Sequence, residues 1–211
     1  MTTELIPGLA GVPAAASKIA DINGNEGKLY YRGYLIEDLA EHTTFEETSY
    51  LLLYGELPTR AQLTAFDARL RQHRRLKYKI IDVLKTLPET GHPMDALQAG
   101  VAAMGMFYPA RDVMDAKVQE ESIIRLIAKV PTIVAAFHRV RHGDEVVQPR
   151  DDLSHAANFL YLLNGTEPDP VSAKTLDVCL VLHAEHSMNE STFAARVVGQ
   201  RGQRGQCGVQ P

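Results

Sequence analysis

The sequence predicts an all-α protein with a short extended or hairpin segment at its N-terminus. Three observations lead to this prediction. Apolar residues recur at helical spacing through most of the chain from residue 35 to residue 198. Glycines and prolines punctuate these stretches where helices are expected to end or begin. The first 34 residues instead combine closely spaced Gly and Pro with an Asn-Gly pair. We therefore divide the chain into an irregular or extended segment (1–34), a helical portion (35–198) and a tail (199–211).

The N-terminal segment contains one hairpin signal. Residues 21–27 form a turn sequence around the Asn-Gly pair. The flanks, residues 17–22 and 28–31, are short enough to pair as two strands. No further sheet is expected.

Start and stop signals divide the helical portion. A helix is expected to begin at Thr44, which can form a capping box with Glu47, and to end at Gly55. The next helix opens at Thr59. Pro131 is expected to bend a long helix, because proline removes a backbone donor. The remaining helices are expected at about 35–40, 76–87, from His92-Pro93 onward, 113–142, 151–163 and 171–198.

The helix that opens at His92 carries an unusual number of small residues. Small side chains let a second helix approach closely, so this helix is expected to pack against another helix or against another subunit. The small residues are Ala96, Ala99, Gly100, Ala102, Ala103 and Gly105.

The tail, residues 199–211, has a composition of its own. It contains a near-repeat of Gly-Gln-Arg, one aliphatic residue and no helical period. Such a segment cannot bury enough apolar surface to order itself, so we expect disorder. A truncation or a change of reading frame would leave a tail of this kind.

The overall charge argues against a nucleic-acid-binding surface. The 211 residues include 22 Lys and Arg against 26 Asp and Glu, a formal net charge of -4. A run of basic residues is expected to be a solvated helix face, because acidic residues offset it elsewhere. This run comprises Arg69, Arg71, Arg74, Arg75, Lys77 and Lys79.

The sequence also lacks the features expected of membrane proteins and of secreted proteins. No apolar stretch reaches the roughly 18 residues that span a bilayer, and residues 1–20 lack a basic leader followed by an apolar core. The two cysteines suggest neither a disulfide framework nor a zinc site, and Cys179 is expected to be a small buried hydrophobe. We expect a cytoplasmic protein.

One cluster of polar residues, residues 183–192, is a candidate for chemistry. If the expected helix is continuous, His183, His186 and Asn189 follow one another at intervals of three and share a face. They could bind a metal ion with a third ligand from elsewhere, donate hydrogen bonds to a small dianion, or be satisfied core polar groups. The spacing alone leaves all three open.

Several segments together resemble bacterial-type citrate synthases, and the resemblance is to an N-terminal portion of that family. It runs in one order from residue 5 to about residue 198, so it is more specific than any single motif. The segments that carry it are residues 7–13 (PGLAGVP), 27–34 (GKLYYRGY), 36–40 (IEDLA), 48–58, 125–133, 153–160 and 183–192.

The resemblance implies an all-helical fold with a large and a small domain, an active site in the cleft between them, and a dimer or a multiple of dimers. It implies an acyltransferase that condenses acetyl-CoA with oxaloacetate to give citrate and CoA. It also implies oxaloacetate binding by His186, with His183 and Asn189 close by. No cofactor is expected, because acetyl-CoA is a substrate.

The sequence departs from the family in lacking the catalytic residues. The resemblance leads us to expect a catalytic histidine in a Gly-Pro-Leu-His-Gly segment, a second histidine before an arginine, and an aspartate base. None can be assigned here, so we expect a truncated chain that is inactive alone. Two alternatives remain: a 2-methylcitrate synthase acting on propionyl-CoA, and a non-catalytic helical module for dimerisation or dicarboxylate binding.

Overall fold

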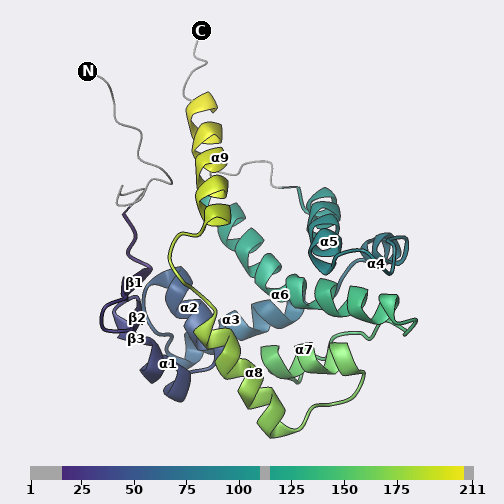
Figure 1. The fold of residues 1–211 in the computed structure, drawn as a ribbon, viewed down its shortest axis with the longest axis horizontal. Helices are drawn as coiled ribbons and strands as arrows, with labels where there is room; N and C mark the ends of the chain where they lie inside the picture. Colours follow the sequence, from purple (N-terminus) through teal and green to yellow (C-terminus); the bar gives the residue numbers. More distant parts are fainter. Residues whose placement is uncertain (1–15, 110–114, 207–211) are drawn as a thin grey trace.

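A small antiparallel sheet precedes the helices in the computed structural model, which describes residues 16–109 and 115–206 (Figure 1). Strands β1 (Ala20–Asn23) and β2 (Lys28–Tyr31) pair around the Asn-Gly turn, as the sequence predicts. A short β3 (Tyr34–Leu35) adds to β2 and makes a third strand that was not expected. The first 15 residues of the predicted N-terminal segment lie outside the described residues.

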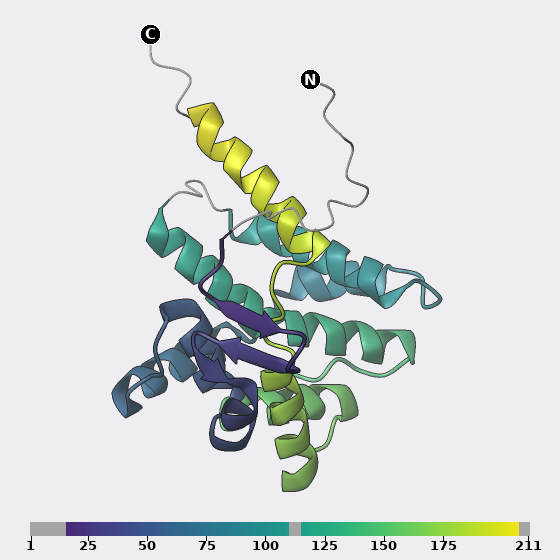
Figure 2. The ribbon, with the colours of Figure 1, turned by 60° about the vertical axis from the view of Figure 1, so that its left-hand side comes forward.

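Most of the remaining described chain is helical, which confirms the predicted fold class. Figure 1 shows the sheet at one edge of the helices, and both ribbon views show α9 projecting away from them (Figures 1 and 2). The helices are α1 (Ile36–His42), α2 (Phe45–Tyr54), α3 (Arg60–His73), α4 (Tyr78–Lys85), α5 (Pro93–Phe107), α6 (Ala116–Arg141), α7 (His155–Asn164), α8 (Pro170–Leu182) and α9 (Glu190–Gln206).

The residues predicted to begin and end α2 form the expected capping contacts. The Thr44 hydroxyl accepts from the backbone N–H of Glu47, and the Glu47 carboxylate accepts from the backbone N–H of Thr44 at 2.8 Å. Gly55 closes the helix at φ 92°, in the left-handed region that glycine enters without strain. Thr59 and Gln62 form a second capping box at the start of α3.

The long helix α6 connects two of the hydrophobic clusters. Its N-terminal half contributes Ile124 and Ala128 to a cluster with α2 and α3. Its C-terminal half contributes Ile133 and Phe137 to a cluster with α4 and α5. Pro131 lies inside the helix, and both ribbon views show α6 changing direction along its length (Figures 1 and 2).

The small residues of α5 allow a close approach to α6. A Cβ at Gly100 would lie 2.7 Å from Cγ2 of Ile133, whereas nothing lies within 4 Å of a Cβ at Gly105. Gly100 therefore permits the contact between the two helices, as the sequence pattern indicated.

Two expectations about individual side chains are wrong. Arg74 is not part of a solvated face: it is only 1% exposed, and its Nη1 donates to the backbone oxygens of Arg150 and Leu153, both at 2.8 Å. Cys179 is exposed on α8 instead of buried. Arginine side chains are usually exposed and cysteine side chains are usually buried, so the tertiary packing reverses the usual burial of both residues.

The C-terminal helical prediction also needs correction. Residues 171–198 do not form one helix, because α8 ends at Leu182 and α9 begins at Glu190. In addition, α9 continues through residues 199–206, where no helix was expected. Gln and Arg are good helix formers, which offsets part of the cost of about 1 kcal/mol for each glycine in a helix. Residues 207–211 of the predicted tail lie outside the described residues.

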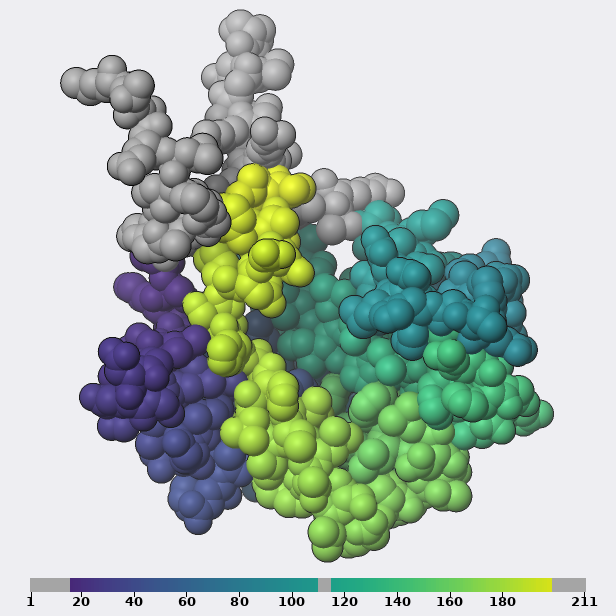
Figure 3. Space-filling view, in the orientation of Figure 1, coloured from purple at the N-terminus to yellow at the C-terminus, as the bar shows by residue number. Residues whose placement is uncertain are grey.

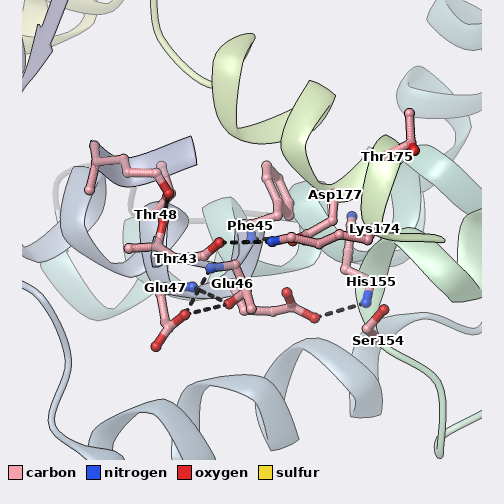
Figure 4. A network of polar contacts seen from close by, with 12 residues as sticks. Thr43, Phe45, Glu46, Glu47, Thr48, Ser154, His155, Lys174, Thr175 and Asp177 are labelled. Carbon is pink, nitrogen blue, oxygen red and sulfur yellow. Dashed lines mark hydrogen bonds and ion pairs between the residues drawn. The ribbon is translucent and has the colours of Figure 1, made fainter. Parts of the chain in front are cut away.

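Two buried carboxylates accept backbone N–H groups at the starts of neighbouring helices (Figure 4). Glu46 of α2 accepts from His155 of α7 at 2.8 Å, and Asp177 of α8 accepts from Phe45 of α2 at 2.9 Å. Helix N-termini favour negative charge, although burial raises the pKa of Glu46. These contacts fix α2, α7 and α8 against one another and give both carboxylates a structural role.

His155 makes folding sensitive to acid. Its side chain is buried, and burial, together with the nearby Arg74 guanidinium, lowers its pKa to about 3. The unfolded chain takes up a proton at this residue below about pH 6.5, whereas the folded chain does not. The stability contributed by neutral His155 is therefore full above pH 6.5 and is lost as the pH falls toward 3. Between pH 6.5 and 5, we expect a loss of about 2 kcal/mol in the free energy of unfolding.

Urea unfolding of the wild type and of His155→Gln at pH 7 and pH 5 measures this effect. The variant lacks the titrating ring but keeps Glu46, whose raised pKa acts in the opposite direction. The difference between the two proteins therefore isolates His155. The same pH dependence in both would contradict the prediction.

Candidate functional site

The candidate site lies in the non-helical segment between α8 and α9, residues 183–189, which we call the α8–α9 connection. His183, His186 and Asn189 all lie in it, and all three are exposed. Figure 3 shows this yellow-green part of the chain on the surface of the molecule. The structure therefore brings the three predicted residues into one short exposed segment.

The three residues do not share a helical face, which corrects the geometry assumed from their spacing. His183 ends α8, and its backbone N–H donates to the Cys179 oxygen at 3.1 Å. Ser187 has a φ of 66°, a left-handed conformation that interrupts any helix at this point. Asn189 then precedes α9, and its Oδ1 accepts from the backbone N–H of Thr192 at 2.8 Å.

Hydrogen bonds determine what each polar group can offer to a ligand. His183 Nδ1 lies 2.7 Å from the Cys179 oxygen, and because a carbonyl can only accept, Nδ1 carries the proton. Nε2 of His183 can then donate to an anion only after the ring is protonated. The Asn189 oxygen is engaged by Thr192, and its NH₂ group forms no hydrogen bond with the described residues. The His186 side chain forms no hydrogen bond or ion pair with the described residues. These groups suit a small anion.

Two residues that the sequence analysis did not select hold the connection in place. The buried Tyr31 hydroxyl donates to the Leu182 oxygen at 3.2 Å and accepts from the backbone N–H of Glu185 at 3.1 Å. The Glu185 carboxylate accepts from the backbone N–H of Ser187 at 2.6 Å. The sequence signal for Tyr31 was weak, because an inward-facing tyrosine in a strand is ordinarily a core residue.

An apolar groove of about 460 Å³ opens beside the connection. His183, Ala184 and Glu185 form one of its walls. Side chains from α2, α6 and α8 and from the segment before β1 complete it: Ile19, Phe45, Ser49, Leu52, Leu53, Ile127 and Leu180. Of the three candidate residues, His183 thus lies at the edge of an apolar surface.

A larger groove, of about 650 Å³, lies beside Tyr108 at the N-terminal part of α6. Two of its cations, Arg69 and Arg125, are paired with carboxylates of the same groove, and Lys117 also lines it. Arg69 contacts Glu120 at 2.6 Å and Glu121 at 3.1 Å, and Arg125 contacts Glu121 at 3.1 Å. Because the two arginines already contact Glu120 and Glu121, this groove is a weaker candidate for an anion than the α8–α9 connection.

Residues 16–109 and 115–206 contain neither a metal-binding cluster nor a membrane-spanning helix. The His, Cys, Asp and Glu side chains there form no group of three or more that could hold a metal ion. None of the helices in these two ranges is both long and apolar enough to cross a bilayer.

Comparison with known proteins gives the family. The model described as "Citrate synthase, C-terminal domain" matches residues 8–202. The citrate synthase of Synechocystis is 55% identical over 190 residues, which cover 90% of this chain and 48% of that protein. The crystal structure of citrate synthase from Pyrobaculum aerophilum superposes with a TM-score of 0.84 at 44% identity, covering 92% of this chain and 50% of that one.

A relative named for a different reaction matches a similar share of the chain. The 2-methylcitrate synthase of Shewanella oneidensis is 39% identical over 191 residues, covering 90% of this chain and 50% of that protein. The chain therefore spans about half the length of the curated relatives it matches. The family model covers nearly the whole sequence, and the helical fold agrees with it. The chain belongs to the citrate synthase family.

Proposed function

We propose that this chain provides the oxaloacetate-binding segment of a citrate synthase, the acyltransferase that condenses acetyl-CoA with oxaloacetate. The observation that carries the proposal is the α8–α9 connection, in which His186 is exposed and without a side-chain partner in the described part of the chain. His183 and Asn189 lie in the same segment, and the family is one whose members are named for this reaction.

The chemistry of the connection suits a dicarboxylate. A protonated imidazole offers a charge-assisted hydrogen bond to a carboxylate, and the Asn189 NH₂ group offers a neutral one. Donors aimed at the ketone oxygen of oxaloacetate would also make its carbonyl carbon more electrophilic. Because all three residues are exposed, the connection alone binds weakly, and further groups must enclose the substrate for tight binding and catalysis.

The acyl donor and the assembly belong to the same proposal. Acetyl-CoA is the favoured donor, since relatives named citrate synthase reach 55% identity. Propionyl-CoA is the second candidate, because the 2-methylcitrate synthase of S. oneidensis matches a similar share of the chain. We propose cytoplasmic location and assembly as a homodimer or a multiple of dimers. The catalytic histidines and aspartate are supplied from outside residues 1–211, so this chain by itself has no turnover.

Titration with oxaloacetate tests the binding part of the proposal. We expect the ligand to shift the imidazole C–H resonances of His186 and His183 in NMR spectra, and His186→Ala to raise the Kd at least about tenfold, the effect of losing one charge-assisted hydrogen bond. His42→Ala is the matched control, because His42 is also an exposed histidine but lies at the end of α1. Equal affinity for oxaloacetate in His186→Ala and the wild type would refute the assignment.

Release of CoA from acetyl-CoA and oxaloacetate tests the catalytic part. We expect the 211-residue chain, with its mass verified, to release no CoA above background. Turnover that follows the purified chain would show that residues within it supply a base and a stabiliser of the enol.

A further inference from the structure

We propose that Tyr31 is the positioning residue of the α8–α9 connection: its buried hydroxyl fixes where His186 lies. Through that position it controls how tightly the connection holds a dicarboxylate. The ligand in this inference rests on the proposed function, but the positioning itself rests on contacts within the chain.

The Tyr31 hydroxyl satisfies two backbone groups that the end of α8 leaves without helical partners. It donates its one proton to the Leu182 oxygen at 3.2 Å and accepts from the Glu185 N–H at 3.1 Å. A hydroxyl can do both at once, since it carries one proton and two acceptor lone pairs. This single oxygen therefore joins β2 to the last residue of α8 and to Glu185 of the connection, across about 150 residues of sequence.

A second hydrogen bond constrains the backbone on the other side of His186. The Glu185 carboxylate accepts from the Ser187 N–H at 2.6 Å, and Ser187 has a φ of 66°. A left-handed conformation is unfavourable for a residue other than glycine, so it needs such support. His186 thus lies between two residues whose backbones are held, while its own side chain has no partner in the described residues. Its location depends on Tyr31 and Glu185.

Tyr31 is well placed to act as a rigid anchor. Its side chain is completely buried, and it packs in one hydrophobic cluster with Ile36, Leu39, Leu51 and Val181. Its backbone is paired on both sides, with Ala20 of β1 and with Tyr34 of β3. Phenylalanine would keep the ring and its packing and would remove only the oxygen. The substitution therefore separates positioning from core packing.

Tyr31→Phe, examined first without ligand, tests the positioning. We expect the Glu185 amide to exchange with solvent about tenfold faster, the usual scale for one lost hydrogen bond. The His186 imidazole resonances are expected to move or broaden. Ile124→Val is the control, because it weakens a different cluster and leaves the connection untouched. Unchanged Glu185 exchange and His186 resonances in Tyr31→Phe would overturn the proposal.

Oxaloacetate titration of the same variants separates this proposal from the proposed function. We expect the Kd to rise about tenfold in Tyr31→Phe and to stay unchanged in Ile124→Val. If the wild type does not bind oxaloacetate while the ligand-free measurements change, the proposed function fails and the positioning stands. If the wild type binds and Tyr31→Phe binds equally well, the positioning fails and the proposed function stands.

Discussion

Arg74→Ala is expected to lower the free energy of unfolding by about 3–5 kcal/mol, because the variant loses a buried side chain and leaves two half-buried carbonyls without this donor. Arg74 is almost completely buried, and its Nη1 donates to the backbone oxygens of Arg150 and Leu153. These hydrogen bonds attach the C-terminal end of α3 to the segment that leads into α7. Urea unfolding at pH 7 measures the loss.

Arg75→Ala is the matched control for this prediction. Arg75 is the next residue, but its side chain is 54% exposed and pairs with the exposed Asp151 at 3.1 Å. Exposed ion pairs contribute about 0–1 kcal/mol, so we expect little change. Arg74→Met should fall between the two, since it keeps most of the volume but donates no hydrogen bond. Equal effects of Arg74→Ala and Arg75→Ala would contradict the assigned role of Arg74.

A second readout follows from the charge of Arg74. Its guanidinium is one of the causes that lower the pKa of His155, after burial. The NMR titration of the His155 imidazole in Arg74→Ala should therefore give a higher pKa than in the wild type. An unchanged or lower pKa would mean that the two side chains do not interact as the structure shows.

Gly100→Leu is expected to lower the free energy of unfolding by about 3 kcal/mol or more, because α5 and α6 approach too closely for a side chain there. Even a methyl group would lie 2.7 Å from Cγ2 of Ile133. Ile133 is β-branched and fully buried, so it has little freedom to move aside. Gly100→Ala should cost about 1–2 kcal/mol, because alanine's better helix propensity offsets part of the overlap.

Two further variants make this prediction specific. Gly105→Ala lies on the same helix with nothing within 4 Å of the new Cβ, so it should stabilise the protein by about 0.5–1 kcal/mol. In an Ile133→Ala background the interfering methyl is gone, and Gly100→Ala should lose its penalty. A penalty that persists in that background would show that Ile133 is not the obstacle. Thermal and urea unfolding of the single and double variants provide the measurements.

The sequence by itself determined the helical class, the hairpin and several helix ends. These features depend on groups close together in the chain. The Asn-Gly turn joins β1 to β2, the Thr44 capping box starts α2, and Gly55 ends it. The small residues of α5 also indicated a close helix contact, since glycine and alanine can be recognised directly in the sequence. The order of family-like segments led to the same family that the comparisons show.

Only the tertiary structure decided the form of the candidate site. The sequence placed His183, His186 and Asn189 in one segment but put them on one helix, because apolar residues at helical spacing occur on both sides of them. The helix instead stops at Leu182, where the hydroxyl of Tyr31 supplies the hydrogen bonds that a continued helix would have made. Arg74 is buried for a similar reason, since its partners are carbonyls nearly 80 residues away. Local patterns report the preferences of neighbouring residues, whereas these outcomes depend on hydrogen bonds between groups that only folding brings together.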